Sequence, residues 1–147
     1  MAMFRHSFPT SGRAIARGLP ARALLCAAFC LLLHAWPDAA RARDIGTREA
    51  AALLQSPPQG LLILDVRTPD EFRRGHLPGA RNMDFFGGRF DLEAAALPRE
   101  QPVLLYCRTG RRSAEAAETL EKAGVKTILH MNQGIEAWQA DGLPLEK

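Results

Sequence analysis

The chain has 147 residues, of which 47% are hydrophobic and 24% are charged, and this ordinary globular composition excludes wholesale disorder. Its formal net charge of +3 comes from the start of the chain, because residues 1–42 hold five arginines and a single aspartate. Residues 43–147 carry 14 basic and 15 acidic side chains, a net charge of −1. The charge of this larger part therefore gives no support for a nucleic-acid partner.

Residues 1–42 have the layout of an export signal. Four arginines between residues 5 and 22 precede an apolar run of ten residues, Leu24–Leu33, and Ala40-Arg41-Ala42 fits the small-x-small pattern that signal peptidase reads. A retained membrane anchor is the competing interpretation, although a spanning helix needs about 20 apolar residues. We expect residues 1–42 to be a cleaved signal peptide and residues 43–147 to be one periplasmic domain, with no membrane contact after cleavage.

The three cysteines are divided between the expected signal peptide and the domain. Cys26 and Cys30 belong to the expected signal peptide, so the domain keeps Cys107 alone. A lone cysteine forms no internal disulfide, and an odd thiol in an exported protein is a candidate reactive group. It also excludes a multi-cysteine zinc site, and His76 and His130 lie at no ligand-like spacing from it. We expect no metal and no other cofactor.

The first half of the domain alternates helix and strand. Thr47 is expected to cap a helix over residues 48–55, and the apolar run Leu61–Leu64 is typical of a buried strand. Thr68-Pro69-Asp70-Glu71 predicts a helix start, because Thr and Glu at this spacing form a capping box and Pro is favoured at the first helical position. A short strand is expected over residues 80–83.

The second half continues the alternation. The expected elements are a helix over 91–97, a strand over 103–106, a helix over 113–123, a strand over 126–131 and a helix over 135–140. Strands that alternate with helices predict an α/β fold, in which a mainly parallel sheet is covered by helices on both faces.

The candidate site lies where one of these strands ends. In a parallel sheet ligands bind beyond the carboxyl ends of the strands, and Cys107 directly follows the strand over 103–106. A short loop, Arg108-Thr109-Gly110-Arg111-Arg112, then leads into the helix expected from Ser113. Inward backbone N–H groups and the helix dipole favour an anion and stabilise a thiolate. The alternative is an inert buried thiol, which needs neither the glycine turn nor the arginines.

Four stretches of this sequence, taken together, resemble a known family. They are residues 64–72 (LDVRTPDEF), 75–80 (GHLPGA), 106–113 (YCRTGRRS) and 134–138 (GIEAW). In this order they look like a single-domain rhodanese, and the resemblance runs from about Asp44 to Lys147. With the expected export signal, the chain also resembles the exported phage-shock-type periplasmic rhodaneses. One departure is Gln133, because a Gly-Gly pair often precedes the last helix in the family.

The resemblance implies a fold, an activity and a site. The fold is a mainly parallel five-stranded sheet flanked by helices on both faces. The activity is thiosulfate sulfurtransferase, which moves a sulfane sulfur from a small sulfur-containing anion to cyanide or a thiol. By position, Cys107 is the catalytic residue that carries the persulfide. The substrate-binding residues are those of the loop that cradles the outer sulfur: Arg108, Thr109, Gly110, Arg111 and Arg112.

Two other functions stay open. Cysteine phosphatases and arsenate reductases use a similar loop and helix, but their signature places arginine after five intervening residues, where this chain has Ser113. The shorter loop suits one sulfur atom better than a tetrahedral phosphate. The second alternative is a non-catalytic module that relays sulfur or binds a partner, with a protein as the sulfur acceptor.

Several other polar and aromatic residues have structural interpretations. Asp65 and Arg67 flank a strand end, where an ion pair that supports the fold is favoured over catalysis. His76 lies in a turn and is expected to form structural hydrogen bonds. His130 ends the last strand on the active-site edge, where contact with substrate is the lesser alternative. The phenylalanines between residues 85 and 90 are expected to pack in the core, with an apolar wall beside the pocket as the alternative.

Overall fold

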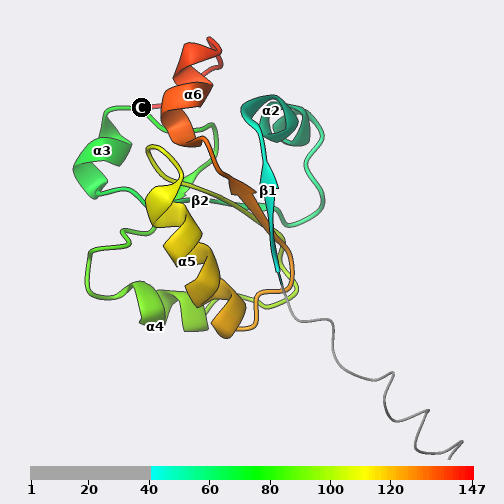
Figure 1. The fold of residues 1–147 in the computed structure, drawn as a ribbon, viewed down its shortest axis with the longest axis vertical. Helices are drawn as coiled ribbons and strands as arrows, with labels where there is room; N and C mark the ends of the chain where they lie inside the picture. Colours follow the sequence, from blue (N-terminus) through cyan, green and yellow to red (C-terminus); the bar gives the residue numbers. More distant parts are fainter. Residues whose placement is uncertain (1–40) are drawn as a thin grey trace, which may run out of the picture. The chain divides into compact units, whose positions relative to one another are not determined.

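The computed structural model describes residues 41–147, so the predicted export signal lies outside the described residues except at its last two positions. Within this part of the chain, no helix is long and apolar enough to cross a membrane. The described residues form strands and helices in alternation (Figure 1). The strands are β1 (Ala42–Ile45), β2 (Leu62–Asp65), β3 (Arg81–Asn82), β4 (Val103–Tyr106) and β5 (Ile128–Met131). The helices are α2 (Thr47–Gln55), α3 (Pro69–Arg73), α4 (Phe90–Ala95), α5 (Arg111–Lys122) and α6 (Gly134–Ala140).

The five strands make one sheet in the order β1-β5-β4-β2-β3, and every neighbouring pair is parallel. The predicted α/β fold with a parallel five-stranded sheet is therefore confirmed. β4 lies at the centre of the sheet and all four of its residues are buried. Val103 and Leu105 pack on one face of the sheet and Leu104 and Tyr106 on the other, as the continuous apolar run predicted.

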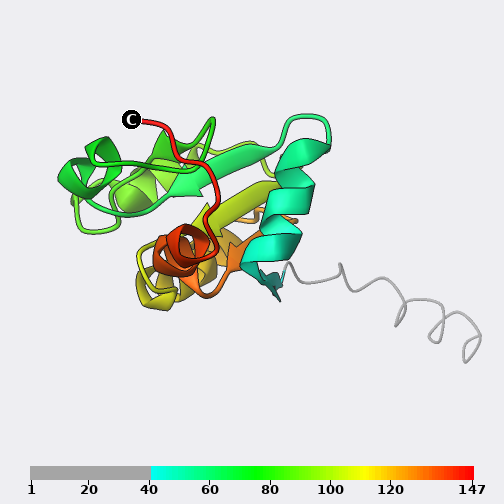
Figure 2. The ribbon, with the colours of Figure 1, turned by 90° about the horizontal axis from the view of Figure 1, so that it is seen from above.

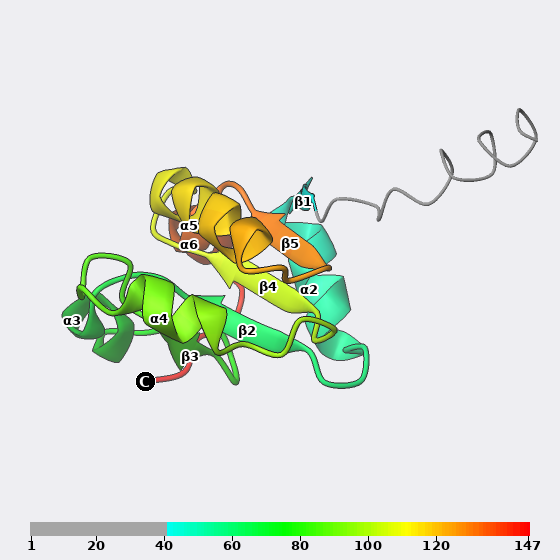
Figure 3. The same ribbon diagram turned by 90° about the horizontal axis from the view of Figure 1, so that it is seen from below.

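Helices cover both faces of the sheet. On one face, α4 and α5 pack over a core that includes Leu64, Leu105 and Leu120, and Figure 3 shows these two helices in front of the strands. On the other face, α2 and α6 pack over a second core that includes Ile45 and Trp138, and Figure 2 shows them from that side. Packing on both faces holds the strands in position, and therefore also the start of each loop at the carboxyl edge of the sheet.

Three of the expected local details are wrong. Thr47 does not cap α2, because the helix already includes Thr47 and its N-cap is Gly46. The helix expected from Ser113 begins two residues earlier, so Arg111 and Arg112 belong to the first turn of α5 and not to the loop. The strand β1 had no counterpart among the expected elements, although the five-stranded sheet implied by the resemblance requires it.

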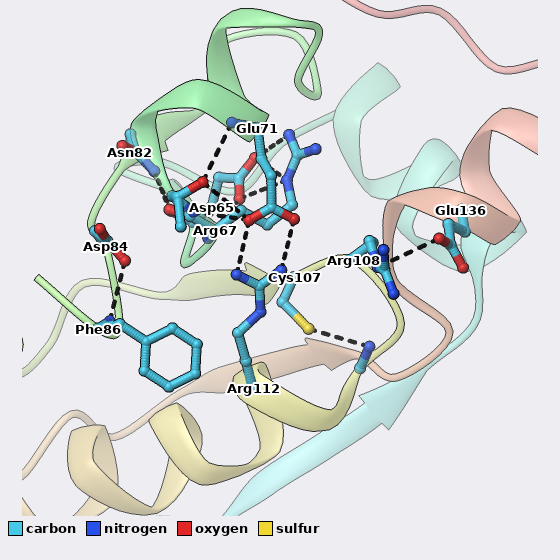
Figure 4. A network of polar contacts seen from close by, with 12 residues as sticks. Asp65, Arg67, Glu71, Asn82, Asp84, Phe86, Cys107, Arg108, Arg112 and Glu136 are labelled. Carbon is cyan, nitrogen blue, oxygen red and sulfur yellow. Dashed lines mark hydrogen bonds and ion pairs between the residues drawn. The ribbon is translucent and has the colours of Figure 1, made fainter.

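The capping box at the start of α3 forms as predicted. The Glu71 N–H donates to Thr68 Oγ1 at 3.3 Å, and the Thr68 N–H donates back to Glu71 Oε2 at 3.1 Å. Pro69 occupies the first turn, where its missing N–H costs nothing. This short helix stands at the carboxyl end of β2 and presents Glu71 toward the loop that follows β4 (Figure 4).

Candidate active site

Cys107 lies at the carboxyl end of the central strand β4 and is 1% exposed. The chain then turns sharply, so that the Gly110 N–H donates to Cys107 Sγ at 3.1 Å (Figure 4). This hydrogen bond stabilises the thiolate more than the thiol, because an anionic sulfur is the stronger acceptor. The first turn of α5 follows immediately, so its unpaired N–H groups and its dipole also face the sulfur.

Burial and hydrogen bonding act on this thiol in opposite directions. Burial raises the pKa of Cys107, whereas hydrogen bonds from the Ser113 hydroxyl and from the backbone N–H groups of Ser113, Thr109 and Gly110 lower it. The hydrogen bonds outweigh burial, and the pKa of Cys107 lies below that of an ordinary thiol. Cys107 is also the one free cysteine among the described residues.

Two glycines allow the backbone of the Cys107 loop to pack directly against the backbone of the segment that joins β5 to α6. Gly110 has φ +96°, and a Cβ there would lie 1.8 Å from the Asn132 carbonyl oxygen. Gly134 has φ +67°, and a Cβ there would lie 2.3 Å from the Arg108 carbonyl oxygen. Both positions therefore exclude any side chain. The N–H groups of the first turn of α6 complete the contact, because Ile135 donates to the Cys107 carbonyl at 2.9 Å.

Arg112 does not lie free in the site. Its guanidinium donates two hydrogen bonds of 2.8 Å to the Glu71 carboxylate, and the two side chains are 15% and 18% exposed (Figure 4). The hydrogen bond from Arg112 is the largest effect on Glu71 and lowers the pKa of that carboxyl to about 2. Arg112 also faces the Cys107 sulfur, and both Glu71 and this sulfur raise the pKa of the guanidinium. The arginine thus pairs with the Glu71 carboxylate, and its charge also acts on the sulfur.

A cavity of about 520 Å³ opens over the loop that follows Cys107. Its lining combines cations, one carboxylate and one aromatic ring: Glu71, Phe86, Arg108, Thr109, Arg111 and Arg112. Phe86 is 66% exposed, and the Arg112 guanidinium lies 5.8 Å from the centre of its ring. Three arginines against one carboxylate give the lining an excess of positive charge, which favours a small anion over a cation.

This chain is similar in sequence and in fold to proteins of one known family. The model of the rhodanese-like domain matches residues 47–141. A sulfurtransferase of Allochromatium vinosum is 32% identical over 87 residues, which cover 59% of this chain and 79% of that protein. A thiosulfate sulfurtransferase of Pseudomonas putida is 32% identical over 82 residues, 56% of this chain and 73% of that protein. The crystal structure of a rhodanese-related protein from Thermoplasma volcanium superposes with a TM-score of 0.61 at 25% identity, covering 71% of this chain and 97% of that one.

The chain belongs to the rhodanese-like domain family. Its match to some relatives is partial: it spans 26% of the length of a Mycobacterium tuberculosis protein named as a probable adenylyltransferase/sulfurtransferase, with 37% identity over 101 residues. The resemblance stated from the four sequence stretches is therefore correct at the level of the family.

In this rhodanese-like domain the predicted loop residues have different environments. Arg108, Thr109, Arg111 and Arg112 line the cavity, while Gly110 is buried below it and donates to the sulfur. Arg108 also lies 3.4 Å from the Glu136 carboxylate on α6 (Figure 4). Gln133, the departure from the Gly-Gly pattern, has φ −90° and ψ −10°, which any residue adopts, so only Gly134 needs to be glycine here.

The other residues singled out from the sequence have mostly structural positions. Asp65 and Arg67 form a buried ion pair, with Arg67 Nη2 2.6 Å from Asp65 Oδ2. His76 stacks on Phe72 at 3.8 Å, and its Nδ1 lies 3.2 Å from the Phe72 carbonyl oxygen. Phe90 is buried in the core, whereas Phe86 forms the apolar wall that was the alternative.

Two residues of the site were missed from the sequence. Glu71 was interpreted only as a capping residue, although one carboxylate oxygen caps α3 while both bind Arg112. Ser113 was taken as the start of a helix, but it is 0% exposed and its hydroxyl donates to the Gly110 carbonyl at 3.0 Å, so it helps to hold the residue whose N–H binds the sulfur. Within residues 41–147 no group of three His, Cys, Asp or Glu side chains is placed to hold a metal ion.

Proposed function

We propose that this rhodanese-like domain is a sulfurtransferase that carries a persulfide on Cys107. The observation that carries the proposal is the hydrogen bond from the Gly110 N–H to Cys107 Sγ, within a loop whose other residues line an arginine-rich cavity. The lowered pKa of this thiol increases the fraction present as the nucleophilic thiolate. The family membership and the sulfurtransferase names of the relatives support the same reaction class.

The first step takes sulfur from the donor. The Cys107 thiolate attacks the outer sulfur of thiosulfate, a new S–S bond forms, and the S–S bond of thiosulfate breaks. Sulfite leaves with the bonding electron pair, and the domain holds an anionic persulfide. The arginines that line the cavity attract the dianionic donor and stabilise the departing sulfite, as preorganised charge does in other group transfers.

The second step returns the thiolate. A nucleophile such as cyanide or a thiolate attacks the outer sulfur of the persulfide, and the Cys107 sulfur leaves as the thiolate. The N–H groups around the loop stabilise negative charge on the inner sulfur before and after this step, so neither step leaves an uncompensated anion. The cavity is open to a small acceptor or to a thiol presented by a protein.

The nucleophile is tested by Cys107→Ser. We expect this variant to form no persulfide and to lose turnover, because a serine hydroxyl is far too weak an acid to replace the thiolate. The measurement is peptide-resolved mass spectrometry of the full chain before and after thiosulfate, together with thiocyanate formation from thiosulfate and cyanide. A variant with both Cys26→Ser and Cys30→Ser is the matched control and keeps the activity. Sulfur transfer by Cys107→Ser above background contradicts the assignment.

Phosphatase activity is the rival reaction for the same type of cradle. The loop between Cys107 and the start of α5 contains three residues, Arg108–Gly110, and Gly110 and Gly134 hold it against the neighbouring backbone. A tetrahedral phosphate needs more room than this. We expect negligible hydrolysis of an aryl phosphate by the protein that transfers sulfur. A phosphatase rate above the sulfurtransferase rate after repurification would reverse the choice.

A non-catalytic sulfur relay is distinguished by turnover. A relay module accepts one sulfur per Cys107 and releases it only to a specific partner, whereas the proposed enzyme turns over with thiosulfate and cyanide alone. Pre-steady-state and steady-state thiocyanate formation separate the two. A single stoichiometric release without turnover would favour the relay and a protein acceptor.

We also propose that the chain is exported and acts in the periplasm after cleavage at or near Ala42. The basic front and short apolar run of residues 1–33 and the Ala40-Arg41-Ala42 pattern support this. Cleavage after Ala42 would leave Arg43–Ile45 of β1 paired with β5. The test is the intact mass of the protein in periplasmic and membrane fractions. A full-length chain in the membrane fraction would instead support the retained anchor.

A further inference from the structure

A second cavity adjoins the first one at Glu71 and Arg108, which line both. Its volume is about 300 Å³, which is enough for part of a small molecule. Arg67, which follows β2, Arg74 at the end of α3 and Glu136 on α6 contribute charged groups to the second cavity alone. The proposed attack on thiosulfate uses none of these three residues, so the second cavity has no role in the donor step.

The charges of the second cavity leave one cation without a partner. Its lining contains three arginines and two glutamates. Four of these five side chains are paired with an opposite charge: Arg67 with Asp65, Arg108 with Glu136 and Glu71 with Arg112. The fifth is Arg74, which is exposed and has no carboxylate partner within residues 41–147. One unpaired cation favours a ligand group with a single negative charge.

The buried Arg67 adds a free hydrogen-bond donor to the same wall. Its Nε and Nη2 donate to the Asp65 carboxylate, and Nη2 also donates to the Gly75 carbonyl. Its Nη1 has no hydrogen-bond partner in the described part of the chain, although the side chain is only 7% exposed. Among the described residues, no side-chain nitrogen or oxygen that is sealed from solvent lacks a partner, so Nη1 is open to the cavity that Arg67 lines. Such a donor suits an oxygen of a bound molecule.

The pair between Arg108 and Glu136 stands where the two cavities meet. Figure 4 shows Arg108 between Cys107 and Glu136, and the two charged groups are 3.4 Å apart. Their side chains are 62% and 56% exposed, and an ion pair so open to water contributes little free energy. Arg108 is therefore free to turn toward an anion in either cavity, and a molecule that crosses it would occupy both.

We propose that the second cavity binds the carboxylate of the thiol that accepts the sulfur, with Arg74 and the free donor of Arg67 as its contacts. The proposal deepens the proposed function and rests on it. The acceptor thiolate attacks the outer sulfur of the Cys107 persulfide from the first cavity. One S–S bond forms on the acceptor, the S–S bond at Cys107 breaks, and its electron pair returns to the Cys107 thiolate. The acceptor class is a small thiol with a carboxylate several bonds from its sulfur.

The test isolates the acceptor step from the donor step. The full-length chain is loaded with thiosulfate, freed of the donor and mixed with either ω-mercaptohexanoate or ω-mercaptohexanol. These two thiols have similar length and thiol acidity and differ in the carboxylate. Peptide-resolved mass spectrometry follows the loss of the persulfide from Cys107 and gives a second-order rate constant for each thiol. We expect the constant for the acid to be about fivefold larger than that for the alcohol.

Variants of the second cavity decide whether Arg74 causes this preference. Arg74→Gln removes the unpaired cation, so the preference for the acid should fall to about twofold or less, with the rate for the alcohol unchanged. Glu136→Gln removes a negative charge from the same wall and should raise the preference by about twofold. Arg73→Gln is the matched control, because Arg73 pairs with Asp70 and lines neither cavity, and it keeps the wild-type preference.

Three results would overturn the inference: equal rates for the two thiols in the wild type, a wild-type preference in Arg74→Gln, or changes of the same sign in Arg74→Gln and Glu136→Gln. In each of them the loaded wild type still transfers its sulfur to cyanide, so the proposed function stands. Failure of the proposed function is a different observation. The wild type then forms no persulfide with thiosulfate or releases none of it to cyanide, and the inference falls with the function.

Discussion

Two acid–arginine pairs stand near the carboxyl end of β2, and they differ in burial and in what the arginine does besides pairing. In the first, Arg67 binds Asp65 through both Nε and Nη2, and Nη2 also donates to the Gly75 carbonyl at 2.7 Å. In the second, Arg112 binds Glu71 in a two-pronged contact and also faces Cys107 (Figure 4). The first pair joins two parts of the backbone, whereas the second lies in the lining of the candidate site.

The difference in burial decides what each pair contributes. Asp65 and Arg67 have side chains 0% and 7% exposed, so removal of one partner leaves a desolvated charge in the core. Glu71 and Arg112 are 18% and 15% exposed and adjoin a cavity, where water or an anion can replace a lost partner. The same chemical pair therefore lies in the core in one place and beside the candidate site in the other.

Arg67→Ala should have the largest effect, and it acts on stability. We expect the free energy of unfolding to fall by about 3–5 kcal/mol, because Asp65 is left buried without its partner. Denaturant unfolding followed by circular dichroism measures this. Arg73→Ala breaks the exposed Arg73–Asp70 pair and is the control, with an expected loss below about 1 kcal/mol. Equal losses in the two variants would remove the distinction between buried and exposed pairs.

Arg112→Ala should act mainly on the donor. The variant loses a cation at the cavity but keeps the backbone N–H groups and the α5 dipole around Cys107. We expect the KM for thiosulfate to rise about tenfold, while the Cys107 pKa stays below that of a free thiol. Steady-state kinetics and the pH dependence of alkylation check the two parts separately. Lys126→Ala, at an exposed pair with Glu100, is the control. A thiol with an ordinary pKa in Arg112→Ala would show that the side chain, rather than the backbone, activates Cys107.

The smallest expected effect is the loss of the Glu71–Arg112 contribution to stability in acid. The pKa of Glu71 is lowered from 4.5 to about 2, so its contribution to stability is complete above pH 4.5 and is lost as the pH falls toward 2. Glu71→Gln lacks this contribution at every pH. The gap in unfolding free energy between wild type and Glu71→Gln should therefore shrink between pH 4.5 and pH 2. A gap that stays constant over this range would mean that the carboxylate does not stabilise the fold through its charge.

The parts of this molecule that depend on neighbours in sequence were predictable. The capping box at Thr68 is a contact between residues three apart, and the buried strand β4 follows from a continuous apolar run. The position of Cys107 at a strand end follows from the same run, because the carboxyl edge of a parallel sheet is defined by where its strands stop.

The errors have two physical causes, one local and one long-range. α5 begins at Arg111 because Gly110, in a left-handed conformation, takes the N-cap position that side-chain rules assign to a residue such as Ser113. The Ser113 hydroxyl instead reaches back to the Gly110 carbonyl. The pairing of Arg112 with Glu71 joins residues 41 positions apart, and that of His130 with Asp44 joins residues 86 apart. No local pattern encodes contacts that exist only after the sheet has formed.

The sheet order also has a consequence for how the chain is made. β1 is synthesised before the other strands but pairs only with β5, the last, so its hydrogen-bonding edge stays open until nearly the whole domain is available. An open edge invites pairing with other chains, and charged residues such as Arg43 and Asp44 discourage it. The charge of Asp44 thus disfavours intermolecular pairing of β1 during synthesis, and its carboxylate contacts His130 once the sheet is complete.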